Sequence, residues 1–217
     1  MLRDAKVTHP VTYIMVCCSY RGYWTSKGSP TENGIALDAE AALGWIEEEE
    51  GRQIDNHLSK NINLVVWGQS IGAGVATNLA AKQCLFSKNV ALKTLILETP
   101  FLGVRAMLET LYPQKWLPYR YLWPFLRNHL DSWKALGIMK AQSSELKIKP
   151  PKVVILAAGR DELVPSSQSD MLETRCVDLG LSTKKHVIAS AYHTEVLVRP
   201  GGRFAAVEAI QASIKRT

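Results

Sequence analysis

The chain has 217 residues, 47% of them hydrophobic, a formal net charge of +6 and a pI of about 9.1. This length can bury one sizeable core, so we expect a single domain over residues 1–217. The basic residues are dispersed and do not alternate with aromatic ones, which argues against a nucleic-acid partner and favours solvated faces, with an anionic membrane surface as the second option.

No stretch of the sequence has the length and apolarity of a membrane span or the core of a signal peptide. The four cysteines show no C-x-x-C or metal-ligand spacing: Cys17, Cys18, Cys84 and Cys176. Because Cys17 and Cys18 lie in an apolar run, we expect them to be reduced and buried, as in a cytoplasmic protein. We predict no cofactor and no metal.

Residues 11–19, VTYIMVCCS, form a continuous apolar run, which predicts a strand buried on both faces. A loop rich in turn residues follows. Thr31 or Asn33 then offers a cap for a helix that runs through Trp45 and ends at an acidic run and Gly51.

Strand and helix patterns alternate through most of the remaining chain. Strands are expected at residues 62–67, 92–97, 152–157 and 185–189, and helices from the residues after 70 to about 86, at 167–179 and at 204–214. This alternation predicts an α/β fold with a mostly parallel sheet flanked by helices and joined by right-handed crossovers.

The interval 101–133 departs from the alternation. It is rich in aromatic residues and is interrupted by prolines whose spacing excludes one long helix. We expect short helices and turns packed over something apolar; the alternative is ordinary core packing.

The pentapeptide Gly68-Gln69-Ser70-Ile71-Gly72 follows a predicted strand and opens a helix, which is the setting of a G-x-S-x-G nucleophile elbow. Glycines permit the sharp turn, so the Ser70 hydroxyl is expected to project above the sheet while the Ile71 N–H points toward an oxyanion. The alternative is a tight turn in which Ser70 only caps the helix.

An acid and a histidine follow two later strands. Asp161 lies in the loop after residues 152–157 and His193 in the loop after 185–189. Because active sites of parallel sheets gather at the carboxyl ends of the strands, these residues are predicted to join Ser70 as acid and base. Glu162 is the alternative acid, and His186, inside the last strand, is the alternative histidine.

These residues resemble those of the bud-emergence (Bem-type) branch of the α/β-hydrolase superfamily, which includes membrane-anchored acyl-protein thioesterase-like proteins. The resemblance covers nearly the whole chain. It rests on Tyr20-Arg21-Gly22-Tyr23 with Ser26, Gly28, Ser29, Pro30 and Glu32; on Gly68-Gln69-Ser70-Ile71-Gly72; on Glu98-Thr99-Pro100-Phe101; on Leu111-Tyr112-Pro113; on Gly159, Asp161, Val164 and Pro165; and on His193.

The resemblance implies an α/β-hydrolase fold with a small helical cap over about 101–133. It further implies a serine hydrolase that cleaves esters or thioesters of acyl substrates through an acyl-enzyme, with Ser70 as nucleophile, Asp161 as acid and His193 as base. Four aromatic residues are expected to contact the acyl group: Tyr20, Phe101, Trp116 and Trp123.

Family members usually begin with a membrane anchor, several strands and an HG-type loop that supplies a second oxyanion donor. The sequence shows none of these, so we expect a truncated gene model or a fragment, in the cytoplasm or associated with a membrane. The alternatives are a catalytically impaired binding or scaffold module of the same fold and, ranked lower, a peptidase of the superfamily. Oligomeric state stays open.

Overall fold

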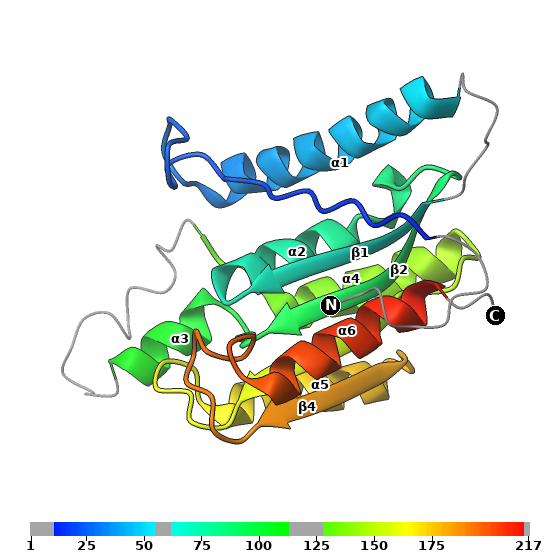
Figure 1. The fold of residues 1–217 in the computed structure, drawn as a ribbon. Helices are drawn as coiled ribbons and strands as arrows, with labels where there is room; N and C mark the ends of the chain where they lie inside the picture. Colours follow the sequence, from blue (N-terminus) through cyan, green and yellow to red (C-terminus); the bar gives the residue numbers. More distant parts are fainter. Residues whose placement is uncertain (1–10, 55–61, 113–127, 215–217) are drawn as a thin grey trace.

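A parallel sheet of four strands lies at the centre of the part of the chain that the structure describes (Figure 1). The structure is a computed structural model and describes residues 11–54, 62–112 and 128–214. Its strands follow one another in chain order across the sheet: β1 (Ile62–Gln69), β2 (Val90–Glu98), β3 (Lys152–Ala158) and β4 (Thr183–Ile188). All neighbouring pairs are parallel, which confirms the predicted α/β class.

Helices cover both faces of this sheet. Figure 1 shows α6 in front of it, α2, α4 and α5 behind it, and α1 beyond β1. The helical elements are α1 (Glu32–Ile54), α2 (Ile71–Ala81), the 3-10 turn η1 (Gln83–Leu85), α3 (Val104–Leu111), α4 (Ser132–Glu145), α5 (Ser166–Asp178) and α6 (Pro200–Ile214). None of the described helices combines the length and apolarity needed to cross a bilayer.

Two apolar layers hold these helices to the sheet, because successive side chains of a strand point to opposite faces. Leu95 and Ile155 pack with Leu136 of α4 in the layer behind the sheet. Ile96 and Leu156 face the α6 side in the other layer. All five side chains have no exposed surface, and burying each contributes about 1.5–3 kcal/mol to stability. The two central strands are thereby fixed, and so are the loops at their carboxyl ends.

The predicted strand at residues 11–19 is wrong. This segment forms no strand, and its side chains are largely exposed, Met15 to 86%. Cys17 and Cys18, which we expected to be buried, are exposed as well. A strand forms only where a neighbour accepts and donates its backbone hydrogen bonds, and among the described residues β1 pairs with β2 alone.

Other differences concern element limits. α1 continues past Gly51, and the helix after residue 70 ends at Ala81 before the short η1 turn. α4 was not predicted, although Asp131 is a good capping signal: its side chain accepts a hydrogen bond of 2.9 Å from the Lys134 N–H. Within the interval 101–133 the structure describes the short helix α3, whereas Trp116 and Trp123 lie outside the described residues. The cap stays a prediction.

Candidate active site

Ser70 lies in a strained turn between β1 and α2. Its φ of 51° and ψ of −115° are unfavourable for a residue with a Cβ. The turn is so tight that a Cβ on Gly68 would lie 2.0 Å from the Gly72 carbonyl oxygen. Although Ser70 precedes α2, its side chain makes no capping hydrogen bond. The hydroxyl is therefore not used to cap the helix.

The first turn of α2 presents backbone N–H groups beside this serine. The Ser70 carbonyl accepts from the Ala73 N–H at 2.9 Å and from the Gly74 N–H at 3.4 Å. Within the described part of the chain, no acceptor is bonded to the Ile71 N–H. A free N–H at the positive end of a helix dipole can stabilise a developing oxyanion.

Asp161 and His193 meet at the carboxyl ends of β3 and β4. His193 Nδ1 lies 2.9 Å from Asp161 Oδ1 and 2.9 Å from Oδ2, and both side chains are buried. An ionised carboxylate only accepts hydrogen bonds, so it places the imidazole proton on Nδ1. Nε2 is then left with a lone pair, which is the state that a general base requires.

Backbone contacts between the two loops set up this pair. The Gly159 N–H donates to the Ile188 carbonyl and the Arg160 N–H to the Ala191 carbonyl, both at 2.9 Å. Gly159 is needed for the close approach, because a Cβ there would lie 2.6 Å from Ala189 Cα. The loop of β3 therefore runs directly against the loop of β4.

The Asp161 carboxylate also shapes its own loop. Its Oδ1 accepts from the Leu163 N–H at 3.0 Å and the Val164 N–H at 2.8 Å. Glu162, the alternative acid, bonds instead to the His193 backbone: its Oε2 accepts from that N–H at 3.0 Å. Asp161 contacts the imidazole ring, whereas Glu162 anchors the segment that carries it.

The alternative histidine, His186, lies apart from this pair. It is on β4, and its Nε2 is 3.9 Å from Glu208 Oε2 on α6. Burial and then the neighbouring Lys184 lower the pKa of His186. No contact joins His186 to Asp161 within the described residues, so the imidazole at the sheet edge is that of His193.

Glu98 is a buried carboxylate at the same edge, and the sequence analysis named it as part of the motif Glu98-Thr99-Pro100-Phe101 without assigning it a role. Its Oε2 accepts from Trp67 Nε1 and its Oε1 from Gln69 Nε2, each at 3.1 Å. Burial raises the pKa of Glu98, and the Trp67 bond, the charge of His193 and the Gln69 bond oppose this. Asp161 was found as an acid that follows a parallel strand, and the same signal was present at Glu98.

Ser70 and His193 are not hydrogen-bonded to each other in the described structure. Ser70 is bonded to the end of β2 instead, because the Glu98 carbonyl accepts from the Ser70 N–H at 2.9 Å. Catalytic hydrogen bonds are often long in the absence of substrate. The structure thus joins Asp161 to His193 directly and Ser70 to the end of β2.

The two described aromatic residues expected to contact an acyl group lie in the core near α1. Phe101 is buried in a cluster that includes Ile35 of α1 and Val164, and Tyr20 packs against the same cluster. Their role in substrate binding stays a prediction. Trp116 and Trp123 lie outside the described residues.

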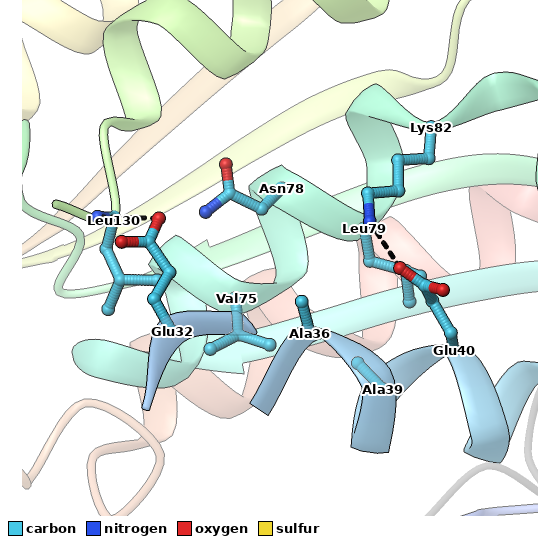
Figure 2. Close-up of a pocket in the computed structure, with 9 residues that line it drawn as sticks. All are labelled: Glu32, Ala36, Ala39, Glu40, Val75, Asn78, Leu79, Lys82 and Leu130. Atoms are coloured by element: carbon cyan, nitrogen blue, oxygen red, sulfur yellow. Dashed lines mark hydrogen bonds and ion pairs between the residues drawn. The ribbon is translucent and has the colours of Figure 1, made fainter. Parts of the chain in front are cut away.

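A shallow hollow of about 280 Å³, part of it open solvent, lies between α1 and α2 (Figure 2). Val75 and Leu79 form its apolar side, and an ion pair between Glu40 and Lys82 closes one end. None of Ser70, Asp161 and His193 lines it. The described residues contain no group of three His, Cys, Asp or Glu side chains arranged to hold a metal ion.

Comparison with known proteins gives relatives that include a lipase. No protein-family profile matches the chain. It is 34% identical over 160 residues to the lysophosphatidylserine lipase ABHD12 of Xenopus tropicalis, a match that covers 74% of this chain and 38% of the relative. It is 30% identical over 184 residues to protein bem46 of Schizosaccharomyces pombe, covering 84% of this chain and 52% of the relative. The chain thus spans about half the length of these curated relatives, or less.

Solved structures of hydrolases share the fold. A hydrolase from Agrobacterium vitis superposes with a TM-score of 0.58 at 15% identity, covering 91% of this chain and 75% of the other. The esterase Pf2001 of Pyrococcus furiosus superposes with a TM-score of 0.58 at 17% identity, covering 90% and 68%. At such identities the likeness concerns the fold alone.

Proposed function

Since this chain belongs to the α/β-hydrolase superfamily, we propose that it is a serine hydrolase that cleaves carboxylic ester bonds of acyl substrates. Ser70 is the nucleophile, His193 the base and Asp161 its acid. The observation that carries the proposal is the placement of His193 Nδ1 at 2.9 Å from both oxygens of Asp161. A buried imidazole held in this tautomer has its second nitrogen free to accept a serine proton.

The reaction proceeds in two steps. Ser70 Oγ attacks the acyl carbonyl carbon and gives its proton to His193 Nε2, and the tetrahedral intermediate carries an oxyanion that the Ile71 N–H faces. The bond to the leaving alcohol breaks as Nε2 returns the proton to its oxygen. Water then attacks the acyl-enzyme by the same route and releases the acid. One oxyanion donor is worth about 10²- to 10³-fold in turnover, so a second donor is important for full activity.

The substrate class follows from the named relatives. ABHD12 of Xenopus tropicalis is called a lysophosphatidylserine lipase, so the ester of a single-chain glycerophospholipid is the substrate we place first. A thioester of a long-chain acyl group is the second. Either substrate is amphiphilic, which suits a protein that works in the cytoplasm or peripherally at a membrane surface.

Active-site labelling tests the proposal. A fluorophosphonate probe is expected to label the chain, and Ser70→Ala is expected to abolish the label while leaving the thermal melt cooperative. Release of fatty acid from lysophosphatidylserine, lysophosphatidylcholine and palmitoyl-CoA then separates ester from thioester cleavage. A folded chain that is not labelled, or a Ser70→Ala variant labelled like the wild type, contradicts a serine-hydrolase function.

A second candidate is a binding module that keeps the fold and lacks turnover. It is favoured by the oxyanion site, for which the described residues provide the Ile71 N–H and no second loop donor that we identify. This candidate predicts a folded, unlabelled chain that nevertheless binds acyl ligands. Calorimetry then measures the binding of lysophosphatidylserine to the wild-type and Ser70→Ala chains. Binding distinguishes this module from a chain that neither binds nor cleaves acyl ligands.

A further inference from the structure

Glu32 is the first residue of α1, and the acyl-transfer steps above do not use it. The sequence analysis named it in the motif that follows Gly22 without giving it a role. An acidic side chain in the first turn of a helix commonly interacts with the free N–H groups of that helix. The Glu32 carboxylate bonds instead to backbone 97 and 98 positions later in the chain.

Three hydrogen bonds tie residues 128–130 to the N-terminus of α1. Glu32 Oε2 accepts from the His129 N–H, and Oε1 accepts from the Leu130 N–H at 3.2 Å (Figure 2). The Glu32 N–H in turn donates to the side-chain oxygen of Asn128 at 2.8 Å. Because one carboxylate bonds to two consecutive N–H groups, it fixes the backbone at Leu130.

The backbone of Leu130 is strained. Its φ of 40° lies in the left-handed region, which is unfavourable for a bulky side chain. Such a conformation persists only where surrounding contacts hold it. The Leu130 side chain is buried with Ile35 and Phe101, and its N–H is held by Glu32. Without the Glu32 carboxylate, this backbone is expected to relax.

Leu130 lies against the first turn of α2. A Cβ on Gly74 would be 3.2 Å from Leu130 Cβ, so the side chain of Leu130 meets the helix where it has no side chain of its own. Val75 belongs to the same buried cluster and lines the same hollow (Figure 2). The Gly74 N–H donates to the Ser70 carbonyl at 3.4 Å. Leu130 therefore contacts α2 at the turn that also carries the Ile71 N–H.

We propose that Glu32 is a positioning residue of the active site, which holds Leu130 against the first turn of α2 and thereby fixes the Ile71 N–H that faces the oxyanion. The inference rests on the proposed hydrolase function, in which that N–H acts in the transition state. A displacement of about 1 Å caused far from the chemistry can lower a rate on the order of 10²-fold. Glu32 acts through Leu130 and not on the substrate.

The test compares Glu32→Ala with the control Glu40→Ala. Glu40 lies further along α1, lines the same hollow and pairs with Lys82 at the far end of α2. Hydrolysis of 4-nitrophenyl butyrate is measured above the Ser70→Ala background. In Glu32→Ala, kcat is expected to fall by about 10- to 100-fold with KM within about twofold, because the oxyanion forms only in the transition state. In Glu40→Ala, both constants are expected to stay within about twofold.

Amide hydrogen exchange of the same proteins tests the placement without turnover. Peptides that cover residues 71–75 and 128–130 are expected to exchange faster in Glu32→Ala, because local opening becomes easier where a contact is lost. In Glu40→Ala both segments are expected to exchange as in the wild type. A folded Glu32→Ala variant with unchanged kcat, or with unchanged exchange at residues 71–75, overturns the inference.

If Glu32→Ala does not fold, Glu32→Gln replaces it. The amide keeps one oxygen that accepts a hydrogen bond, whereas its NH₂ group cannot accept one, so one of the two bonds to residues 129 and 130 is lost. The fall in kcat is then expected to be about three- to tenfold, the loss of one hydrogen bond to a charged group. A kcat equal to that of the wild type again overturns the inference.

The two measurements separate this inference from the function on which it rests. A wild-type chain without turnover that depends on Ser70 contradicts the hydrolase function, while faster exchange at residues 71–75 in Glu32→Ala retains the placement of α2 by Glu32. Turnover that depends on Ser70 and is not lowered in Glu32→Ala retains the function and overturns the role of Glu32.

Discussion

His193 Nδ1 lies 2.9 Å from each carboxylate oxygen of Asp161, although the two residues are 32 positions apart and follow different strands. The distance is set by backbone bonds between the loops that follow β3 and β4, in which Gly159 permits contact with Ala189. The pair is therefore a product of parallel strands ending at one edge.

Asp161→Asn tests whether Asp161 is the acid that holds His193 in the tautomer of a base. The new side chain keeps an oxygen that can accept from the Leu163 and Val164 N–H groups, but its NH₂ group faces His193 Nδ1 and favours the wrong tautomer. The rate of fluorophosphonate labelling is expected to fall by about 10³- to 10⁴-fold, as when the acid of a Ser-His-Asp triad becomes an amide.

Glu162→Gln is the matched control, because Glu162 bonds to the His193 backbone and not to the ring. We expect its labelling rate to stay within about tenfold of the wild type, since it loses one hydrogen bond to a charged group. A larger fall in Glu162→Gln than in Asp161→Asn would make Glu162 the acid and remove Asp161 from that role.

The tight turn at the elbow is tested by Gly68→Ala against Gly72→Ala. A Cβ at position 68 meets the Gly72 carbonyl oxygen at 2.0 Å, whereas a Cβ at position 72 meets no atom within 4 Å. Gly68→Ala is expected to lower the free energy of unfolding by about 3 kcal/mol, and Gly72→Ala to change it by less than about 1 kcal/mol. Chemical denaturation measures both; similar losses would contradict the turn geometry.

Cysteine alkylation tests the packing of α5 and the exposure of residues 11–19. Burial raises the pKa of Cys176 to about 11, so about one in a thousand of these thiols is ionised at pH 8. Cys17, Cys18 and Cys84 are exposed. Iodoacetamide at pH 8 is expected to modify these three in the native chain and Cys176 only after unfolding, as read by peptide mass spectrometry. Early modification of Cys176 would contradict the packing of α5.

Cys17 and Cys18 provide an internal comparison in that experiment. Partial burial and then the nearby Asp38 raise the pKa of the Cys18 thiol, whose Sγ lies 3.7 Å from the Asp38 carbonyl oxygen. Cys18 is therefore expected to react more slowly than Cys17. Faster alkylation of Cys18 would contradict the contact of this segment with α1.

The raised pKa of Glu98 predicts how stability depends on pH. The folded state holds the Glu98 proton to a higher pH than the unfolded state does, so in that window folding binds a proton and stability falls as pH rises. The window opens near the usual Glu value of 4.5 and closes above the raised pKa. Glu98→Gln removes this contribution, so the wild type is expected to lose stability relative to the variant across the window.

Denaturant unfolding of both proteins at a series of pH values measures this difference. Above the window, where Glu98 is ionised in both states, the difference is expected to become constant. If the wild type instead loses stability relative to Glu98→Gln as the pH falls below 4.5, the folded state favours the charged carboxylate, which contradicts this prediction.

Local signals in the sequence were enough to predict the sheet and the tight turn before α2. Runs of β-branched and apolar residues predicted the strands of the parallel sheet. The elbow glycines and the polar residues that follow strands singled out Ser70, Asp161 and His193 as candidates. The prediction of the sheet was confirmed because its causes are local: side-chain shape and backbone freedom act within a few residues. The glycine pattern alone predicted the turn at Ser70, whose φ is 51°.

Only the tertiary structure decided which segments pair and which charges are buried. Residues 11–19 have a strand-like composition but no strand neighbour in the described structure, so their apolar side chains and two cysteines are exposed. The sequence places Glu98 in the motif Glu98-Thr99-Pro100-Phe101 and does not show that it is buried. The register that sets it opposite Gln69 made it a buried partner of Trp67 and Gln69, because hydrogen bonding between strands depends on residues far apart in the chain.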